Sequence, residues 1–396
     1  MISKRISLIN ESITLAISAK AKQMRKDGID VIGFGAGEPD FDTPSHIKEA
    51  AKDAVDNGFT KYTPAGGIKE LKSAICDKFR KDNNLEYKEN EVIISCGAKH
   101  SLFNAICSLC NDDDEVIIPA PFWVSYPEMV KASGAKPVII PTGQKDGFKI
   151  NPKQLKEKIT SRTKVLILNS PSNPTGAVYT KEELRALADT ILDNKIFCIS
   201  DEIYEKIVYD GISFTSIASL GEDIKSLTIV INGVSKAYSM TGWRIGYAAA
   251  NPRIIRAMVN LQSHSTSNPA SISQMAALEA LRGPQDCVDK MVGEFRKRRG
   301  FMVNRINSIK GISCMKPDGA FYAFVSIKDV LGEKFSGRAI DNSLQFADAL
   351  LDSAHVAVVP GSAFGLDGYI RLSYAVSLDN MKKGLERIEN FLGKLK

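Results

Sequence analysis

The feature that most constrains the fold is an alternation of short apolar runs with helical patterns between about residues 45 and 280. Apolar runs of strand length occur at 91–95, 115–118, 137–140, 164–168, 196–199, 227–231 and 245–249. Helical patterns lie between most of them, as at 181–193, where apolar side chains recur every three or four positions. Thr180 followed three residues later by Glu183 is typical of the capping box that begins a helix. The alternation predicts an α/β fold with a mostly parallel central sheet covered by helices on both faces.

The pattern changes after about residue 284. A long charged helix is expected over roughly 285–309, then strands at 320–325, 355–359 and 369–373, with helices at 342–352 and 377–393. A chain of 396 residues is too long for one ordinary core. We therefore expect three parts: an N-terminal arm and helix at 1–45 that packs on the small domain or a partner subunit, a large domain at 46–283, and a smaller α+β domain at 284–396.

Composition and charge argue against several classes of function. The net charge of +6 is spread along the chain, and short basic runs such as 296–299 read as solvated helix faces, so no nucleic-acid partner is expected. No apolar run reaches 18 residues and the first 20 residues lack a signal-peptide core, so we expect no membrane partner and a cytoplasmic location. The seven cysteines and four histidines show no metal-site spacing, and Cys107 and Cys110 fall in an apolar helical stretch typical of a core.

Polar and charged residues follow several of the predicted strands, at the edge where an open α/β sheet binds ligands. The segments that follow are C-G-A-K at 96–99, N-S-P-S-N-P-T-G at 169–176, D-E-I-Y at 201–204, and N-G-V-S-K at 232–236 with Arg244 beyond it. Taken singly, Asp201 can be a helix cap, and Gly97 and the N-P-T-G segment can be simple turns. Their shared position at one edge of the sheet favours a binding site.

These residue types are the ones that pyridoxal phosphate (PLP) chemistry needs. A lysine can attach the cofactor, and a carboxylate can keep its pyridine nitrogen protonated so that the ring accepts electrons. Phenol and amide donors can fix the ring oxygen, and an arginine with a helix start can hold the phosphate. A dinucleotide site is rejected, because the G-x-G-x-G at 33–37 is followed by Glu38 instead of glycine and by Pro39-Asp40 instead of a helix.

The segment V-S-K-A-Y-S-M-T-G-W-R-I-G-Y at 234–247 resembles the cofactor-attachment motif of class I aminotransferases. Further segments resemble the prokaryotic aspartate aminotransferase branch (subgroup Ib), in the same order, at 34–44, 61–67, 121–128, 173–176, 201–204 and 369–375. The resemblance runs from about residue 10 to 390. It implies the PLP-dependent transferase fold of type I and a homodimer with shared active sites.

The resemblance implies that the cofactor is held by Gly97, Ala98, Trp123, Asn173, Asp201, Tyr204, Ser235, Lys236, Arg244 and, from the neighbouring subunit, Tyr62. Lys236 would attach the cofactor and move the proton between the substrate Cα and the cofactor C4′. Asp201 would pair with the pyridinium nitrogen, and Tyr204 and Asn173 would contact the ring oxygen. Trp123 would stack on the ring.

The phosphate of the cofactor would lie at the helix start at 97–98, against Arg244, with Tyr62 reaching it from the neighbouring subunit. One position departs from the family pattern. Many members place a serine three residues before the attachment lysine, and this chain has Gly233 there. We expect the nearby Ser235 to substitute for that serine.

The resemblance implies that the substrate is bound by Gly37, Trp123, Asn173, Arg371, Lys99, Thr14 and Ser12. Arg371 would clamp the α-carboxylate with two parallel hydrogen bonds, and Gly37 would contact the substrate through its backbone. Residues 257–281 contain no arginine that could bind a distal carboxylate. That role would pass to Lys99, helped by Ser12 or Thr14.

These roles predict an aminotransferase that moves the amino group of L-aspartate to 2-oxoglutarate, giving oxaloacetate and L-glutamate. The implied mechanism is ping-pong, through pyridoxamine phosphate. Aromatic, prephenate, alanine or kynurenine transaminases and β-lyases remain alternatives, because a fold does not fix a reaction. Relatives that use prephenate often carry a basic residue where Asn10 stands, which disfavours that activity. A non-catalytic regulator is a remote alternative, since no DNA-binding head precedes residue 45.

Overall fold

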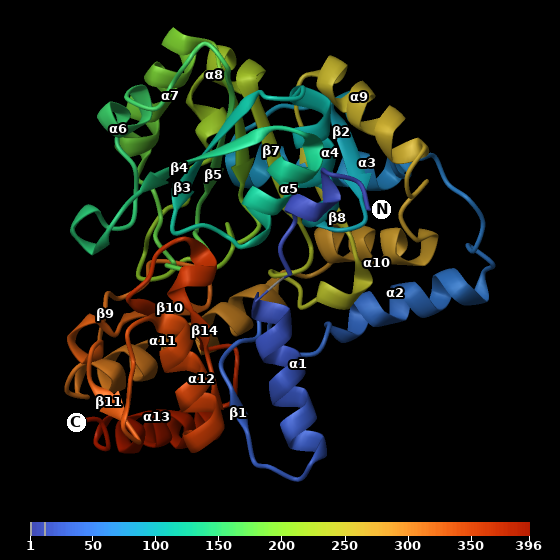
Figure 1. Cartoon of the computed structure of the whole chain (residues 1–396). Helices are drawn as coiled ribbons and strands as arrows, with labels where there is room; N and C mark the ends of the chain where they lie inside the picture. Colours follow the sequence, from blue (N-terminus) through green and yellow to red (C-terminus); the bar gives the residue numbers. More distant parts are fainter. Residues whose placement is uncertain (1, 12) are drawn as a thin grey trace.

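The computed structural model describes residues 2–11 and 13–396, so Ser12 lies outside the described residues. Two sheets organise the chain (Figure 1). The larger sheet consists of β2 (Val92–Ser95), β3 (Glu115–Ala120), β4 (Lys136–Pro141), β5 (Thr163–Asn169), β6 (Phe197–Asp201), β7 (Thr228–Gly233) and β8 (Gly246–Ala249). Each of the seven predicted apolar runs is one of these strands. Their order across the sheet is β2-β8-β7-β6-β5-β3-β4.

The larger sheet is mostly parallel, as predicted, and β8 is the exception. It runs antiparallel to both of its neighbours, β2 and β7. Parallel neighbours need a crossover connection, usually through a helix. The chain between β7 and β8 instead stays at the carboxyl end of β7, in turns and a short 3-10 helix (Thr241–Trp243), so β8 returns in the opposite direction.

Helices cover both faces of the larger sheet, which explains why its strands are apolar throughout. One face packs against α4 (Ala98–Leu109), α5 (Ser125–Ser133) and α9 (Pro252–Ser263). The other packs against α6 (Pro152–Lys156), α7 (Lys181–Asn194) and α8 (Glu222–Leu227), and, near β2, against α2 (Ser45–Asp56), α3 (Lys69–Asn83) and α10 (Ser271–Arg282). In β5, Val165 and Ile167 face the first group, whereas Leu166 and Leu168 face the second. The predicted capping box begins α7, with reciprocal hydrogen bonds between Thr180 and Glu183.

The smaller sheet is antiparallel, in the order β14-β15-β10-β9. Its strands are β9 (Ser313–Cys314), β10 (Tyr322–Ser326), β14 (Val359–Pro360) and β15 (Tyr369–Ser373), and it packs with α11 (Asp286–Asn307), α12 (Ser343–Ala354) and α13 (Leu378–Leu392). A separate hairpin joins β11 (Lys334–Phe335) to β12 (Arg338–Ala339). The prediction of a single strand at 355–359 is wrong, because two short strands with different pairing partners lie there. β13 (Val356–Ala357) pairs with β1 (Ile32–Gly33), and only β14 joins the smaller sheet.

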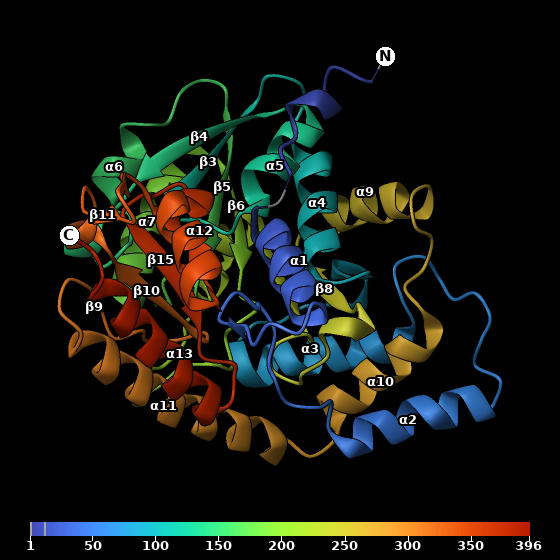
Figure 2. The same cartoon turned by 60° about the horizontal axis from the view of Figure 1, so that its bottom comes forward.

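The N-terminal helix α1 (Ile13–Lys26) packs beside α12 (Figure 2). Its buried residues Ile17 and Ala21 share a core with Leu351 of α12 and Ala357 of β13. The segment before α1 contacts α5, which packs on the larger sheet: the backbone N–H of Asn10 donates to Glu128 at 2.9 Å. The N-terminal segment therefore contacts both parts of the molecule.

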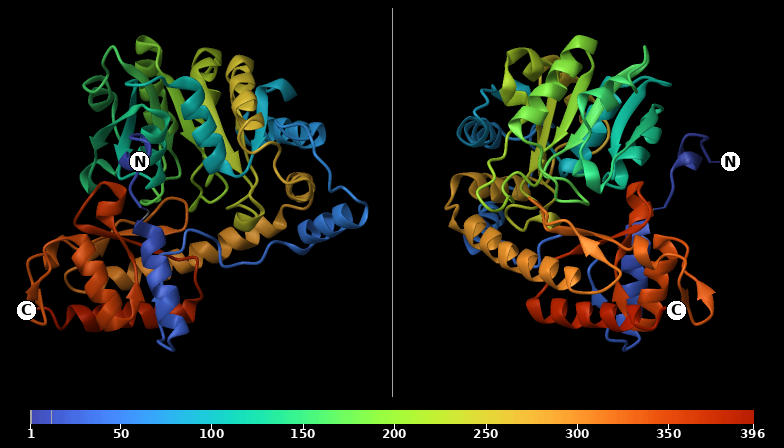
Figure 3. Two further views of the ribbon diagram at one scale, coloured as in Figure 1. Left: turned by 45° about the vertical axis from the view of Figure 1, so that its right-hand side comes forward. Right: turned by 90° about the vertical axis from the view of Figure 1, so that its left-hand side faces the viewer.

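The helix α11 runs from the loops of the larger sheet along the smaller sheet (Figure 3). Its basic run at 296–299 corrects our expectation of a solvated face. Arg298 and Arg299 are buried, because Arg298 pairs with Asp40 and Arg299 pairs with Asp210, each at 2.7 Å. Only the first half of the run is exposed.

Three further observations concern the helices, the possible metal ligands and the cysteines. None of the helices within the described residues is long and apolar enough to cross a membrane. Across residues 2–11 and 13–396, no three His, Cys, Asp or Glu side chains converge as they would around a metal ion. Cys107 and Cys110 are free thiols, half-buried in α4 and at its end.

Candidate active site

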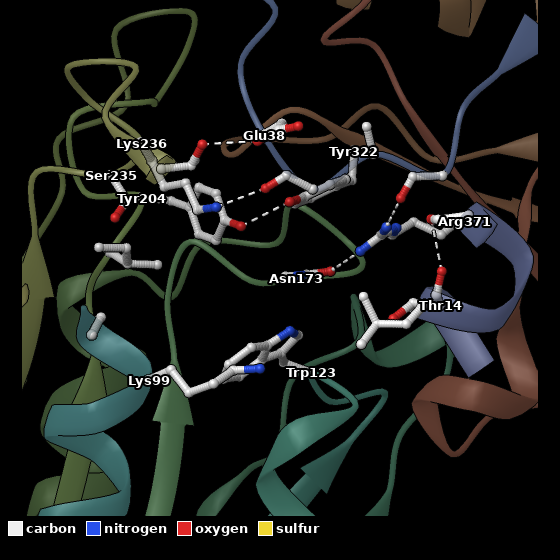
Figure 4. A pocket seen from close by; sticks show the side chains of 18 of the residues that line it. Thr14, Glu38, Lys99, Trp123, Asn173, Tyr204, Ser235, Lys236, Tyr322 and Arg371 are labelled. Carbon is white, nitrogen blue, oxygen red and sulfur yellow. Dashed lines mark hydrogen bonds between the residues drawn. The ribbon is translucent and has the colours of Figure 1, made fainter. Parts of the chain in front are cut away.

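A cavity of about 660 Å³ lies between the two sheets, at the carboxyl ends of β5, β6 and β7 (Figure 4). Most of the residues predicted for the site line it: Thr14, Gly37, Ala98, Lys99, Trp123, Asn173, Asp201, Tyr204, Ser235, Lys236, Arg244 and Arg371. They come from distant parts of the sequence and from both sheets. The cavity lining carries five basic side chains, those of Arg25, Lys99, Lys236, Arg244 and Arg371, and two acidic ones, those of Glu38 and Asp201. This balance suits anionic ligands.

Lys236 enters the cavity from the loop that follows β7. Its Nζ donates a hydrogen bond to the carbonyl oxygen of Gly37 at 2.7 Å and lies 6.0 Å from the centre of the Tyr204 ring. Burial, reinforced by the positive charges of Arg244 and Arg371, lowers the pKa of the Lys236 amine to about 8, although Glu38 opposes the shift. The uncharged, nucleophilic form of this amine is therefore far more populated near neutral pH than that of an ordinary lysine.

Asp201 is the last residue of β6 and is almost fully buried. The Tyr126 hydroxyl donates to its Oδ2 at 2.6 Å, and the backbone N–H of Ile203 donates to its Oδ1 at 3.3 Å. Burial raises the pKa of the Asp201 carboxyl to about 6 despite these hydrogen bonds. No ion pair with a basic side chain reaches it within the described part of the chain, so a cationic group in the cavity would stabilise its charge.

A cradle for an anion lies at the N-terminus of α4. Gly97 precedes the helix with φ +93°, and an added Cβ there would lie 2.3 Å from the guanidinium of Arg244. Arg244 itself has φ 57°, and its Nη1 and Nη2 donate to the carbonyls of Thr241 at 2.9 Å and Cys96 at 3.2 Å. The Arg244 guanidinium and the free backbone N–H groups at the start of α4 thus lie around the same part of the cavity, an arrangement typical of phosphate-binding sites.

The close packing of backbones explains why residue 233 is a glycine. A Cβ on Gly233 would lie 3.0 Å from the Cα of Gly246 and 3.0 Å from the carbonyl oxygen of Ile245. Gly246 in turn packs against the Gly97–Ala98 peptide, with its own Cβ position 2.0 Å from the nitrogen of Ala98. A serine at 233 would require these backbones to shift by a few tenths of an ångström. Ser235 is buried and lines the cavity two residues further on.

Arg371 is buried on β15, 3% exposed, with no acidic partner among residues 2–11 and 13–396. Its Nη1 donates to Asn173 Oδ1 at 2.9 Å and its Nη2 donates to the carbonyl oxygen of Gly35 at 2.8 Å. Its Nε has no hydrogen-bond partner in the described structure. A buried guanidinium with neutral partners and a spare donor has the chemistry to bind a carboxylate.

Lys99 and Trp123 line the cavity together. The Lys99 Nζ lies 4.7 Å from the centre of the Trp123 ring, and that ring meets Tyr126 edge to face at 5.4 Å. Burial lowers the pKa of Lys99, and the charge of Arg244 adds to this effect. Thr14 faces the same cavity from α1.

The structure places Tyr62 apart from the other predicted residues. It is 91% exposed on the loop between α2 and α3 and does not line this cavity. The cavity is also lined by three residues that were not predicted from the sequence, Tyr126, Glu38 and Tyr322. Tyr126 lies in the P-F-W-V-S-Y-P-E segment and Glu38 in the F-G-A-G-E-P-D segment, so the resemblance held a signal for both.

Comparison with known proteins agrees with this geometry. Residues 29–388 match the family described as aminotransferase class I and II. The chain is 52% identical to the aspartate aminotransferase of Bacillus sp. (strain YM-2) and 49% identical to the aspartate/prephenate aminotransferase of Nitrosomonas europaea, in each case over 99% of both chains. The aspartate aminotransferase structure from Rhizobium meliloti, 46% identical, matches with a TM-score of 0.97 over 100% of both chains. That from Thermus thermophilus with maleate, 40% identical, matches with 0.92 over 99% of both chains. The chain is a member of the class I and II aminotransferase family.

Proposed function

We propose that this protein is a PLP-dependent aspartate aminotransferase, which moves the amino group of L-aspartate to 2-oxoglutarate. The observation that carries the proposal is the convergence of Lys236, Asp201 and Arg371 in one cavity. Relatives about 50% identical over nearly the whole chain are aspartate aminotransferases, which supports the reaction and the substrate.

The residues of the cavity fit PLP. The cofactor's pyridinium nitrogen would meet the buried carboxylate of Asp201, which forms no ion pair with a basic side chain of the described residues. Its phosphate would lie at the start of α4, against Gly97, Ala98, Ser235 and Arg244. We assign the ring oxygen to Tyr204 and Asn173 and the stacking contact to Trp123. PLP, when bound, supplies the electron sink that stabilises negative charge on the substrate Cα.

The chain's own residues supply orientation and proton transfer. Lys236 would attach the cofactor and would move the proton at the substrate Cα, because burial lowers the pKa of its amine to about 8. Arg371 and the backbone of Gly37 fix the α-carboxylate, so that the Cα–H bond faces Lys236. Lys99 and Thr14 bind the distal carboxylate of the substrate, together with Ser12, which lies two positions before Thr14 in the sequence.

We further propose a homodimer. Tyr62 is nearly fully exposed and does not line the cavity of its own subunit, which supports a role in completing the phosphate site of a partner subunit. We also propose the division into an arm at 1–45, a large domain at 46–283 and a small domain at 284–396.

An absorbance spectrum of the purified protein with PLP tests this function. We expect a yellow protein that L-aspartate bleaches to the pyridoxamine form and that 2-oxoglutarate restores to yellow. Adding L-phenylalanine, L-alanine and prephenate in place of these substrates separates the alternatives. A yellow protein that responds to another amino acid but not to aspartate would overturn the substrate assignment. A protein that takes up no PLP would overturn the function itself.

Lys99→Gln should raise the KM for aspartate by about 10- to 100-fold, because a lost charge-assisted contact costs about 1.5–3 kcal/mol. The KM for phenylalanine should change much less, since that side chain carries no charge. Lys99→Arg keeps the positive charge and is the matched control, with an intermediate KM expected. Steady-state kinetics with both amino acids measure the effect. Equal changes for aspartate and phenylalanine would argue against a role in binding the distal carboxylate.

A further inference from the structure

Tyr322 is a buried side chain that none of the roles above uses. It begins β10, is 0% exposed, and still lines the cavity. Its hydroxyl oxygen lies 2.8 Å from that of Tyr204, and the Cβ position of Gly37 lies 3.4 Å from it (Figure 4). The guanidinium of Arg371 lies over its ring, 4.4 Å from the ring centre. Tyr322 therefore brings contacts from the smaller sheet to three of the proposed site residues.

The two tyrosine hydroxyls hold two protons between them, and each can donate once. Burial raises the pKa of both Tyr204 and Tyr322, so both are neutral near physiological pH. One proton lies between the two oxygens. Neither hydroxyl makes another hydrogen bond within the described residues, so the second proton is available to a third group. If Tyr322 donates, the free proton is that of Tyr204 and can point into the cavity.

We propose that Tyr322 is a positioning residue with two contributions. Its hydroxyl donates to Tyr204, so that Tyr204 donates in turn to the ring oxygen of the cofactor. Its ring supports the guanidinium of Arg371, which binds the substrate α-carboxylate. The inference rests on the proposed PLP function, because it assigns the acceptor of the Tyr204 proton.

The chain of two hydroxyls has a measurable electrostatic effect. A hydrogen-bond donor at the ring oxygen of the cofactor would stabilise the negative charge on that oxygen. This charge matters most when the nitrogen that would join the cofactor to Lys236 has lost its proton, because the nitrogen then carries no positive charge to compensate it. The donor therefore lowers the pKa of that nitrogen. A donor that itself accepts a hydrogen bond is the stronger one, so Tyr322 strengthens the effect of Tyr204. The charged groups that face this nitrogen are unchanged when Tyr322 loses its hydroxyl: Glu38, Arg244, Arg371 and Asp201.

The experiment is a pH titration of the visible absorbance of the PLP-loaded enzyme and its variants. Tyr322→Phe should raise the titration midpoint by about half a pH unit, and Tyr204→Phe should raise it by about one to two units. In the double variant the shift should equal that of Tyr204→Phe alone, because the hydroxyl of Tyr322 acts through Tyr204. Tyr322→Leu also removes the ring, so it should in addition raise the KM for aspartate and weaken maleate binding by about 3- to 30-fold.

Tyr374→Phe is the matched control. Tyr374 is equally buried and its hydroxyl donates to Ala320 at 3.1 Å, but it does not line the cavity. The midpoint of the absorbance titration of Tyr374→Phe should equal that of the wild type. Thermal melting of every variant checks that the fold is intact. A wild-type midpoint in Tyr322→Phe, or additive shifts in the double variant, would overturn the inference while leaving the proposed function intact. A wild-type protein that takes up no PLP would overturn both.

Discussion

Lys236→Ala should lower the rate of transamination by at least about 10⁴-fold, the largest effect of any single substitution in this chain. The substitution removes two contributions at once, the covalent attachment of the cofactor and the base at the substrate Cα. Within residues 2–11 and 13–396, Lys99 is the other lysine that lines the cavity, and its Nζ lies over the Trp123 ring, 4.7 Å from the ring centre, so it should not replace Lys236. Single-turnover kinetics with the loaded enzyme measure the loss.

Chemical reduction of the loaded protein separates attachment from catalysis. Borohydride should fix the cofactor to Lys236 in the wild type, and mass spectrometry should find no such label in Lys236→Ala. Lys72→Ala is the labelling control, because Lys72 is another lysine whose pKa burial lowers, but it does not line the cavity. It should keep the label at Lys236. A label that persists in Lys236→Ala would show that another lysine holds the cofactor.

The pH dependence of attachment follows from the same side chain. Only the uncharged amine attacks the aldehyde of PLP, and the pKa of Lys236 is lowered to about 8 in the cofactor-free protein. The rate of attachment should therefore rise with pH through about 8 and level off above it. A midpoint near that of an ordinary lysine would mean that the cavity does not desolvate this amine.

The site could be predicted from the sequence because its main residues follow sheet strands. Lys236 and Asp201 come directly after or at the ends of adjacent parallel strands, whose carboxyl ends must lie together. Arg371 lies on the other sheet, and only the family resemblance linked it to the site. Here periodicity and resemblance contributed separate parts of the prediction.

The parts that could not be predicted depend on contacts between distant segments. Tyr322 lies in an apolar strand pattern, which predicts an ordinary core residue. Its contact with Tyr204 could not be predicted, because the two tyrosines come from the two separate parts of the fold. Arg298 and Arg299 read as a solvated run, because their partners lie about 90 to 260 positions away in sequence. The split of 355–359 between β1 and the smaller sheet also depends on pairing partners that periodicity does not reveal.

Asp201→Asn should have the second-largest effect on activity, and it should change stability in the opposite direction. A carboxylate in contact with the pyridinium nitrogen is worth about 4 kcal/mol at an effective dielectric constant of about 20, so its loss should slow transamination by about 10³-fold. Asparagine keeps the shape and can still accept from Tyr126. Asp201→Glu keeps the charge and should therefore lose less activity than Asp201→Asn.

The cofactor-free Asp201→Asn protein should be more stable than the cofactor-free wild type. The pKa of Asp201 rises from 3.8 to about 6 on folding, so the folded protein binds this proton more tightly than the unfolded chain does. Above both values the ionised carboxyl opposes folding by about 3 kcal/mol, and this penalty develops between about pH 4 and pH 6. Asparagine does not titrate, and its amide can meet water because residue 201 lines the cavity. The melting temperature of the variant should thus exceed that of the wild type at pH 7, and the two melting temperatures should be equal at pH 4.

Adding PLP should reverse that order, since the cationic ring nitrogen compensates the charge of Asp201 but gains nothing from asparagine. The wild type should then gain more in melting temperature from PLP than Asp201→Asn does. Equal gains in both proteins, or a variant no more stable than the wild type without cofactor at pH 7, would show that Asp201 is not the charge partner of the cofactor. The burial that makes Asp201 costly in the empty protein is the same burial that makes it effective when a cation is bound.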